Sequence, residues 1–354
     1  MKIDRLLSKF NKLYHSYKKL PSNVIDGLER QGLRIGFVRD LEQDLSLPEN
    51  KALAGASERF MALFQGERSI IHREVVSWNW LTNERVGTGH WLSDAKTSLN
   101  LKYLYNSIKS QPYLCNLACP EISQYFADSS SFLYRALESR DYAGLSLPFG
   151  FSSENVRFDY SGGCFVPMTP VIEKFQMMRR TLDILANIQL NLKATDFKGE
   201  LMIEPLGYQP ALAYGKGDSA FMCVTDPEFI AEALNRSGWR LLFDVAHLLI
   251  SAGNMGYNAP LEYVERMMAP PGRQVLREIR LTVPQKREGL WGNSRQPFFK
   301  LDTSEAADVA STLEYLILNR PKETPLAINF GTPVETVDQD AFMLVLFLRE
   351  VLGF

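Results

Sequence analysis

Two carboxylates end short apolar segments of this sequence: Glu204 follows Leu-Met-Ile, and Asp244 follows Leu-Leu-Phe. Segments of this kind are typical of buried strands, so each acid is expected at the carboxyl end of a strand. His247 lies three residues after Asp244. Two carboxylates and one imidazole, completed by water, form a suitable shell for one Fe²⁺, Mn²⁺ or Zn²⁺. Without a metal, the same pair of acids is suited to proton transfer.

The elements that would position these acids alternate between strand and helix. β-rich segments are followed by stretches with helical periodicity, which is the order that a parallel sheet with crossover helices requires. This predicts an α/β protein with a (β/α)₈ TIM barrel, in which Glu204 and Asp244 lie on neighbouring strands. An open, doubly wound sheet is the alternative, but no glycine-rich phosphate-binding motif follows a strand. The eight predicted strands begin at Leu33, Ser69, Pro112, Ala143, Gly199, Arg240, Leu276 and Pro325.

Helices are expected after Pro170, after an Asp226-Pro227 cap, and over 341–352. Two long loops, 149–170 and 207–226, follow the ends of the fourth and fifth predicted strands and are rich in Gly, Tyr, Phe and Ser. Barrels build their sites at the carboxyl ends of the strands, so both loops are predicted to border the site.

The N-terminal segment 1–31 is predicted to be an amphipathic helical extension of a barrel domain that spans 32–354. Its apolar stripe is expected to dock on the barrel, and the alternative is that it lies on a membrane surface. No apolar run is long enough for a transmembrane segment. A net charge of −2 gives no electrostatic footprint for nucleic acid. Four cysteines without CxxC spacing favour a reducing compartment, so the expected location is cytoplasmic.

Three stretches resemble a known family: LMIEPLGYQP from Leu201, the segment Thr225–Met267, and REIRLTVP from Arg277. In order and spacing they are similar to the multinuclear non-haem iron-dependent oxidative enzymes, the family that includes the methanobactin-biosynthesis oxidase. A weaker likeness extends to Glu74–Asn79 and Phe165–Pro170. The resemblance implies a xylose-isomerase-like barrel that binds two or three irons through His, Asp and Glu. It also implies oxidation of residues in precursor peptides, often with a peptide-binding partner protein.

The ligand set departs from that family at most positions. Glu204 and Asp244 occupy matching positions, and His247 stands where the family has an Asn. Arg280 replaces the seventh-strand His, and Asn329 replaces the eighth-strand Glu. The other replaced positions fall at Cys115 or Asn116 and around Leu145, Ser146 and Leu147, and the chain's only histidines are His15, His72, His90 and His247.

The residues at the family's ligand positions can therefore hold at most one metal ion. Two carboxylates that converge in a barrel mouth repel each other, and the repulsion grows as water is excluded. We hypothesise that Arg280 takes over the charge of the missing metal through bonds to Glu204 and Asp244. The alternative is that Arg280 points into solvent.

The function predicted from these residues is that of a diverged family member. Whether it is catalytic or only binds a ligand is left open. It would bind a peptide or a small anionic ligand at the barrel mouth through Glu204, Asp244, Arg280, His247 and Asn329. It would use no cofactor or one divalent metal, with iron as the expected ion. Whether it acts with a partner protein is left open.

Two alternatives stay open. The first is an active iron-dependent oxidoreductase that modifies a peptide. Its metal site would have a smaller ligand set than the family's, made of Glu204, Asp244 and His247. The second is a metal-free isomerase or lyase that uses the paired carboxylates for proton transfer.

Other residues with chemical potential have simpler interpretations. Cys115 and Cys119 are interpreted as small buried hydrophobes. His72 shares a strand face with Glu74 and is interpreted as a satisfied core histidine. The tryptophans at 78, 80 and 91 form either a stacking platform or core packing.

Overall fold

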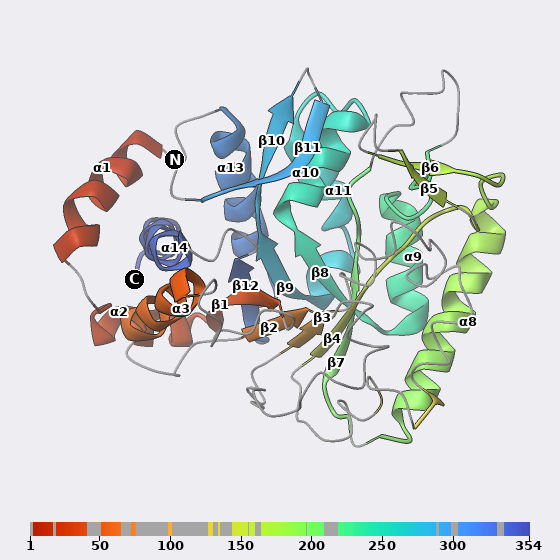
Figure 1. Ribbon diagram of the computed structural model, residues 1–354, viewed down its shortest axis with the longest axis horizontal. Helices are drawn as coiled ribbons and strands as arrows, with labels where there is room; N and C mark the ends of the chain where they lie inside the picture. The colour runs from red at the N-terminus through yellow and green to blue at the C-terminus, as the bar shows by residue number, and fades with distance from the viewer. Residues whose placement is uncertain are drawn as a thin grey trace.

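Eight parallel strands close into a barrel in the order β1-β12-β9-β8-β7-β4-β3-β2 (Figure 1). Each neighbouring pair runs parallel. The strands are β1 (Leu33–Asp40), β2 (His72–Val75), β3 (Ser98–Asn100), β4 (Gly144–Pro148), β7 (Glu200–Glu204), β8 (Arg240–Asp244), β9 (Leu276–Leu281) and β12 (Leu326–Phe330). The predicted α/β fold with a (β/α)₈ barrel is therefore confirmed.

The computed structural model describes residues 3–16, 19–40, 51–64, 72–75, 98–100, 127–129, 134, 144–154, 156–159, 164–195, 197–208, 219–287, 290–298, 304–330 and 336–354. Two antiparallel hairpins stand outside the barrel sheet. They are β5 (Val156–Asp159) with β6 (Cys164–Pro167), and β10 (Val283–Arg287) with β11 (Leu290–Gln296). One hairpin follows the carboxyl end of β4 and the other that of β9, so both lie on the face where the site is expected (Figure 1).

Helices cover the outside of the barrel (Figure 1). The first predicted helix is observed as α8, the second as α9, and the third within α14. At α9 the predicted cap is confirmed, because the Asp226 side chain accepts a hydrogen bond from the backbone N–H of Glu228. The described helices are α1 (Ile3–Leu13), α2 (Ser22–Arg30), α3 (Lys51–Leu63), α8 (Lys174–Leu192), α9 (Pro227–Ser237), α10 (Val245–Asn254), α11 (Pro260–Met267), α12 (Gly272–Val275), α13 (Ser304–Leu318) and α14 (Val337–Leu352), with a 3₁₀ turn at Tyr14–Ser16.

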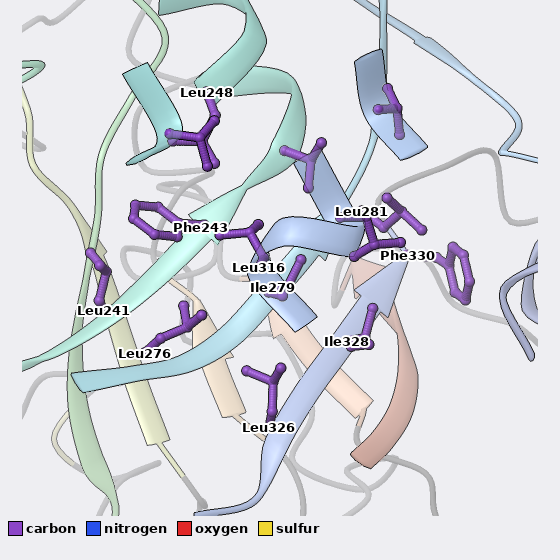
Figure 2. Close-up of a cluster of buried hydrophobic side chains, with 14 of the residues drawn as sticks. Leu241, Phe243, Leu248, Leu276, Ile279, Leu281, Leu316, Leu326, Ile328 and Phe330 are labelled. Atoms are coloured by element: carbon purple, nitrogen blue, oxygen red, sulfur yellow. The ribbon is translucent and has the colours of Figure 1, made fainter. Parts of the chain in front are cut away.

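Polar and apolar side chains alternate along the barrel strands and therefore lie on different faces, because successive side chains point to opposite faces of a strand. The outward face is apolar and packs against the helices. Figure 2 shows part of this layer, with residues of β8, β9 and β12 gathered around Leu316 of α13. Burying one such side chain fully contributes about 1.5–3 kcal/mol. The outward residues of these strands are Leu241, Phe243, Ile279, Leu281, Ile328 and Phe330, all at most 1% exposed.

The third barrel strand differs from the prediction. Ser98–Asn100 pairs with β2 on one side and with β4 on the other, so it fills the third place. The segment predicted for that place, from Pro112, lies outside the described residues. The prediction was wrong because β-propensity measures how well residues fit a half-buried pleated surface, and it does not select the strand's partners.

The N-terminal helix α1 docks its apolar stripe on the C-terminal helix. Leu6 and Phe10 are buried, and the ring of Phe10 packs against Phe342 of α14 at a centroid distance of 6.0 Å. This is the docked arrangement that the sequence predicts. The division into an extension of 1–31 and a barrel of 32–354 stays a prediction. None of the helices in the described ranges has the length and apolar character needed to cross a bilayer.

Asp338, in the first turn of α14, ties this N-terminal region to the barrel. Its carboxylate accepts a hydrogen bond from the Tyr14 hydroxyl at 2.7 Å and one from Arg59 Nε at 3.0 Å. Burial and the neighbouring Asp338 raise the pKa of Tyr14 above its ordinary value, so the phenol stays a donor. One carboxylate thereby joins the turn after α1, helix α3 and helix α14.

We predict that Asp338→Asn lowers the free energy of unfolding by about 1–2 kcal/mol, because hydrogen bonds to a charged acceptor are lost. The loss is not larger because Arg59 is half exposed and solvent screens its ion pair with Asp338. Urea denaturation measures the change. Tyr14→Phe, which removes a single hydrogen bond to the same carboxylate, is expected to cost less. An Asp338→Asn protein as stable as the wild type would contradict this role.

Candidate functional site

The predicted site residues come from four neighbouring strands of the barrel. Glu204 ends β7 and Asp244 ends β8. Arg280 on β9 lies opposite Asp244 in register, and Asn329 on β12 lies opposite Arg280. All four are at most 3% exposed. They alternate with the outward apolar residues, so their side chains share the interior of the barrel.

Asp244 is held in place through one of its two oxygens. Its Oδ1 accepts a hydrogen bond from the backbone N–H of Ala246 at 3.0 Å, which caps helix α10. The hydroxyl of Thr282 is hydrogen-bonded to the same oxygen. The second oxygen, Oδ2, lies 3.6 Å from Arg280 Nε. Asp244 therefore has a fixed orientation that presents Oδ2 to the interior.

Arg280 lies between the two acids, as the sequence predicts. Its Nη1 is 3.7 Å from Glu204 Oε1, and its Nε is 3.6 Å from Asp244 Oδ2. These distances are too long for hydrogen bonds, and Nε, Nη1 and Nη2 are all buried without a hydrogen-bond partner among the residues that the structure describes. The guanidinium thus offsets the repulsion between Glu204 and Asp244 by charge alone. The alternative in which Arg280 points into solvent is wrong, because its side chain is 0% exposed.

His247 completes a group of three possible metal ligands. It lies in the first turn of α10, with Nδ1 3.2 Å from the carbonyl oxygen of Pro205 and 3.9 Å from Glu204 Oε1. Because Nδ1 lies near both oxygens, the tautomer decides its role: as an N–H it donates to the carbonyl of Pro205, and as a lone-pair nitrogen it faces Glu204 and can bind an ion.

The donor atoms of Glu204, Asp244 and His247 all lie within 4.8 Å of one another. Ligand atoms bound to one ion at roughly 2.0–2.2 Å are about 3–4.4 Å apart, so small side-chain shifts bring the three onto a common ion. Two carboxylate oxygens and an imidazole suit a borderline divalent cation. The residues present therefore fit one divalent metal ion. Within the described ranges, this is the single His/Cys/Asp/Glu group of that kind.

A second polar layer lies next to Arg280 along the barrel. Glu278, two residues before Arg280 on β9, is 2% exposed, and Asn329 Nδ2 donates a hydrogen bond to its Oε1 at 2.9 Å. Neither Glu278 nor Thr282 is among the site residues predicted from the sequence. The signal was present, because Glu278, Arg280 and Thr282 put three polar residues on one face of a strand whose other face carries the apolar Ile279 and Leu281.

The loop after Glu204 is fastened to helix α10. The backbone N–H of Tyr208 donates to Ser251 Oγ, and Asn254 Nδ2 donates to the carbonyl of Tyr208, both at 2.9 Å. At Gly207 a Cβ atom would come 3.0 Å from the side chain of Ile250, so the close approach of loop and helix favours a glycine. Ser251 and Asn254 belong to the stretch that carries the family resemblance. In this chain they hold the loop that carries Pro205 against the helix that carries His247.

The remaining sequence candidates contribute little to the described site. Ser146 on β4 is buried. It lies opposite Met202, which is two residues before Glu204 on β7, so Ser146 is on the same inward face as Glu204. Burial raises the pKa of the Cys223 thiol, so it stays protonated and is a poor nucleophile. Positions Cys115, Asn116, Cys119, His90 and the three tryptophans lie outside the described residues, as do the side chains of His72 and Glu74.

The fold and the site together define an α/β protein with a (β/α)₈ barrel and a buried carboxylate and histidine group at the carboxyl ends of its strands. No protein-family profile and no curated protein sequence matches the chain. Among solved structures, the IOLI protein with a bound zinc atom is 10% identical, with 91% of this chain and 100% of that chain covered and a TM-score of 0.50.

Two further similar structures have lower TM-scores. A D-tagatose 3-epimerase-like protein is 13% identical, with 90% of each chain covered and a TM-score of 0.44. A family 2 AP endonuclease from Brucella melitensis is 10% identical, with 86% of this chain and 95% of that chain covered and a TM-score of 0.43. Such low identities show the fold alone. None of the three is described as an iron-dependent oxidase of peptides.

We predict that Arg280→Met lowers the free energy of unfolding of metal-free protein by about 3 kcal/mol or more, because it leaves two buried carboxylates without their cation. Chemical denaturation in chelator measures the loss. Arg236→Met removes an exposed arginine, which pairs with Glu232 on the surface of α9, and is expected to change stability by less than about 0.5 kcal/mol. Equal stabilities of the two variants would show that Arg280 does not neutralise Glu204 and Asp244.

Proposed function

We propose that this protein is a metal-dependent enzyme that holds one divalent cation in its barrel through Glu204, Asp244 and His247. The observation that carries the proposal is the convergence of three donor atoms within 4.8 Å, at the carboxyl ends of β7 and β8. Essentially every characterised barrel enzyme of this type builds its active site on this face. The zinc bound by the IOLI protein, on a similar fold, supports a divalent ion.

A bound cation would supply Lewis-acid polarisation of a substrate oxygen, or activation of water or O₂. The chain's own residues prepare the surroundings for that chemistry. Thr282 and the N–H of Ala246 hold Asp244 Oδ1, which fixes the orientation of the carboxylate, and Oδ2 lies toward Arg280. The carbonyl of Pro205 orients the ring of His247. Arg280 places fixed positive charge beside Glu204 and Asp244, where it can stabilise negative charge that develops on a substrate oxygen.

The resemblance of the segments around Glu204 and Asp244 to the non-haem iron-dependent oxidative enzymes makes Fe²⁺ the first ion to test and a peptide the first substrate. A set of two carboxylates and one histidine is consistent with non-haem iron as well as with zinc or manganese. Because Arg280 and Asn329 replace ligands of that family, a site with two or three irons is not proposed.

A second candidate is a metal-free, non-catalytic protein that binds a peptide or a small anion. It is supported by the position of Arg280, whose charge lies within 3.7 Å of both carboxylates and could stand in for a metal. A metal-free isomerase or lyase that uses Glu204 and Asp244 remains a third, and it would turn over in the presence of chelator. Metal binding separates the lead proposal from both.

We predict that Fe²⁺, Mn²⁺ or Zn²⁺ raises the thermal stability of the purified protein. At a free ion concentration about 100 times Kd, mass action adds about 2.7 kcal/mol, a shift of several degrees in Tm. His247→Ala should remove most of this response, since one of three ligands is lost. Differential scanning fluorimetry under anaerobic conditions, with a titration of each ion, measures both effects.

His15→Ala is the matched control, because His15 is exposed and lies on the turn after α1, remote in sequence from the site. It should respond to the ions like the wild type. Elemental analysis of protein purified without chelator gives the stoichiometry, for which one ion per chain is expected. Two or more irons per chain, or equal responses of His247→Ala and wild type, would contradict the proposed site.

A further inference from the structure

Two buried polar residues of the site, opposite each other on neighbouring strands, carry side-chain atoms without hydrogen-bond partners among the described residues. Within the part of the chain that the structure describes, Nε, Nη1 and Nη2 of Arg280 have no hydrogen-bond acceptor, and Oδ1 of Asn329 has no donor. Both side chains are 0% exposed, and the two residues are opposite each other in the register of β9 and β12. Buried polar groups are nearly always hydrogen-bonded in folded proteins, so a cluster of unsatisfied donors beside an unsatisfied acceptor calls for a ligand or ordered water.

The orientation of the Asn329 amide is fixed by its other neighbour. Nδ2 donates to Glu278 Oε1 at 2.9 Å, and exchanging the amide nitrogen and oxygen would turn a carbonyl oxygen toward that carboxylate. Oδ1 is therefore the atom left over, and it can only accept a hydrogen bond. Arg280, in contrast, can only donate. The pair is complementary to a ligand that carries an acceptor next to a donor.

We propose that Arg280 and Asn329 bind the substrate of the proposed metal site. This substrate is a small α-hydroxy carboxylate, or a residue that carries a hydroxyl next to a carboxylate. The guanidinium donates to the carboxylate, which matches its planar fork, and Asn329 Oδ1 accepts from the neighbouring hydroxyl. A carboxylate is favoured over a neutral carbonyl, because bonds between ionised groups are the stronger ones in a buried site. The inference rests on the proposed function and assigns the substrate class of that site.

The cation and the carboxylate should bind cooperatively. Glu204 and Asp244 lie within 3.7 Å of the same guanidinium, so they repel an incoming anion when no ion is bound. A divalent cation held by these two acids and His247 offsets that repulsion. Each ligand therefore raises the affinity of the site for the other by the same factor.

Calorimetric titration with glycolate tests the inference on wild-type protein, at a fixed free concentration of the ion that stabilises it. Acetate lacks the hydroxyl, and ethylene glycol lacks the carboxylate. We expect glycolate to bind at least tenfold more tightly than either, and its affinity to fall at least tenfold in chelator. Acetate or ethylene glycol binding as tightly as glycolate would overturn the assignment, as would glycolate affinity that chelator leaves unchanged.

Two variants assign the contacts to the residues. Asn329→Leu should bring glycolate down to the affinity of acetate and leave acetate itself unchanged, which also excludes a glycolate that merely chelates the ion. Arg280→Lys, which keeps the charge but loses the fork, should weaken glycolate and acetate at least tenfold while the thermal response to the ion persists. Wild-type affinity for glycolate in either variant would contradict the inference.

The outcome for the proposed function is read separately, from the thermal response to the ion alone. If that response is absent, the metal site fails and the inference built on it fails too. If the response is present but glycolate binds no better than acetate, the metal site stands and the substrate class is wrong. The comparison of probes on wild-type protein decides the question even where a variant does not fold.

Discussion

The guanidinium of Arg280 lies fully buried between two carboxylates, and the interior of this barrel is arranged around that placement. Glu204 and Asp244 come from different strands and would repel each other in a site from which water is largely excluded. Arg280 reaches both at 3.6–3.7 Å without forming a hydrogen bond to either. The guanidinium is therefore paired in charge with both acids, but it has no hydrogen-bond acceptor among the described residues. A buried site with donors to spare is suited to receive a ligand.

The barrel can hold such a cluster because its strands divide their side chains between two environments. The outward faces of β8, β9 and β12 are apolar and contribute to the packing against the helices (Figure 2). That layer supplies stability through burial. The inward faces are then free to carry Asp244, Arg280 and Asn329 at positions that a purely apolar interior would fill with aliphatic residues.

Helix α10 links the fold to the chemistry. It begins immediately after Asp244, whose side chain caps it, and it carries His247 in its first turn. Further along, Ser251 and Asn254 hold the backbone of Tyr208 in the loop that follows Glu204. The three possible metal ligands thus stand on a strand end, a helix cap and a helix turn that are bonded to one another. A rigid support of this kind is what a site needs to hold its residues in position.

The sequence by itself determined the alternation of strands and helices, the cap at Asp226, and the placement of Glu204 and Asp244 at strand ends, because these depend on local periodicity and on residues a few positions apart. It also identified Arg280 as the residue next to both acids. Tertiary structure decided which segment forms the third strand, since that depends on pairing with β2 and β4. It also decided that Glu278 and Asn329 bond to each other and that Arg280 keeps its donors unused. Those outcomes depend on distances between side chains that are far apart in the sequence, 51 residues for Glu278 and Asn329, and no local pattern encodes such distances.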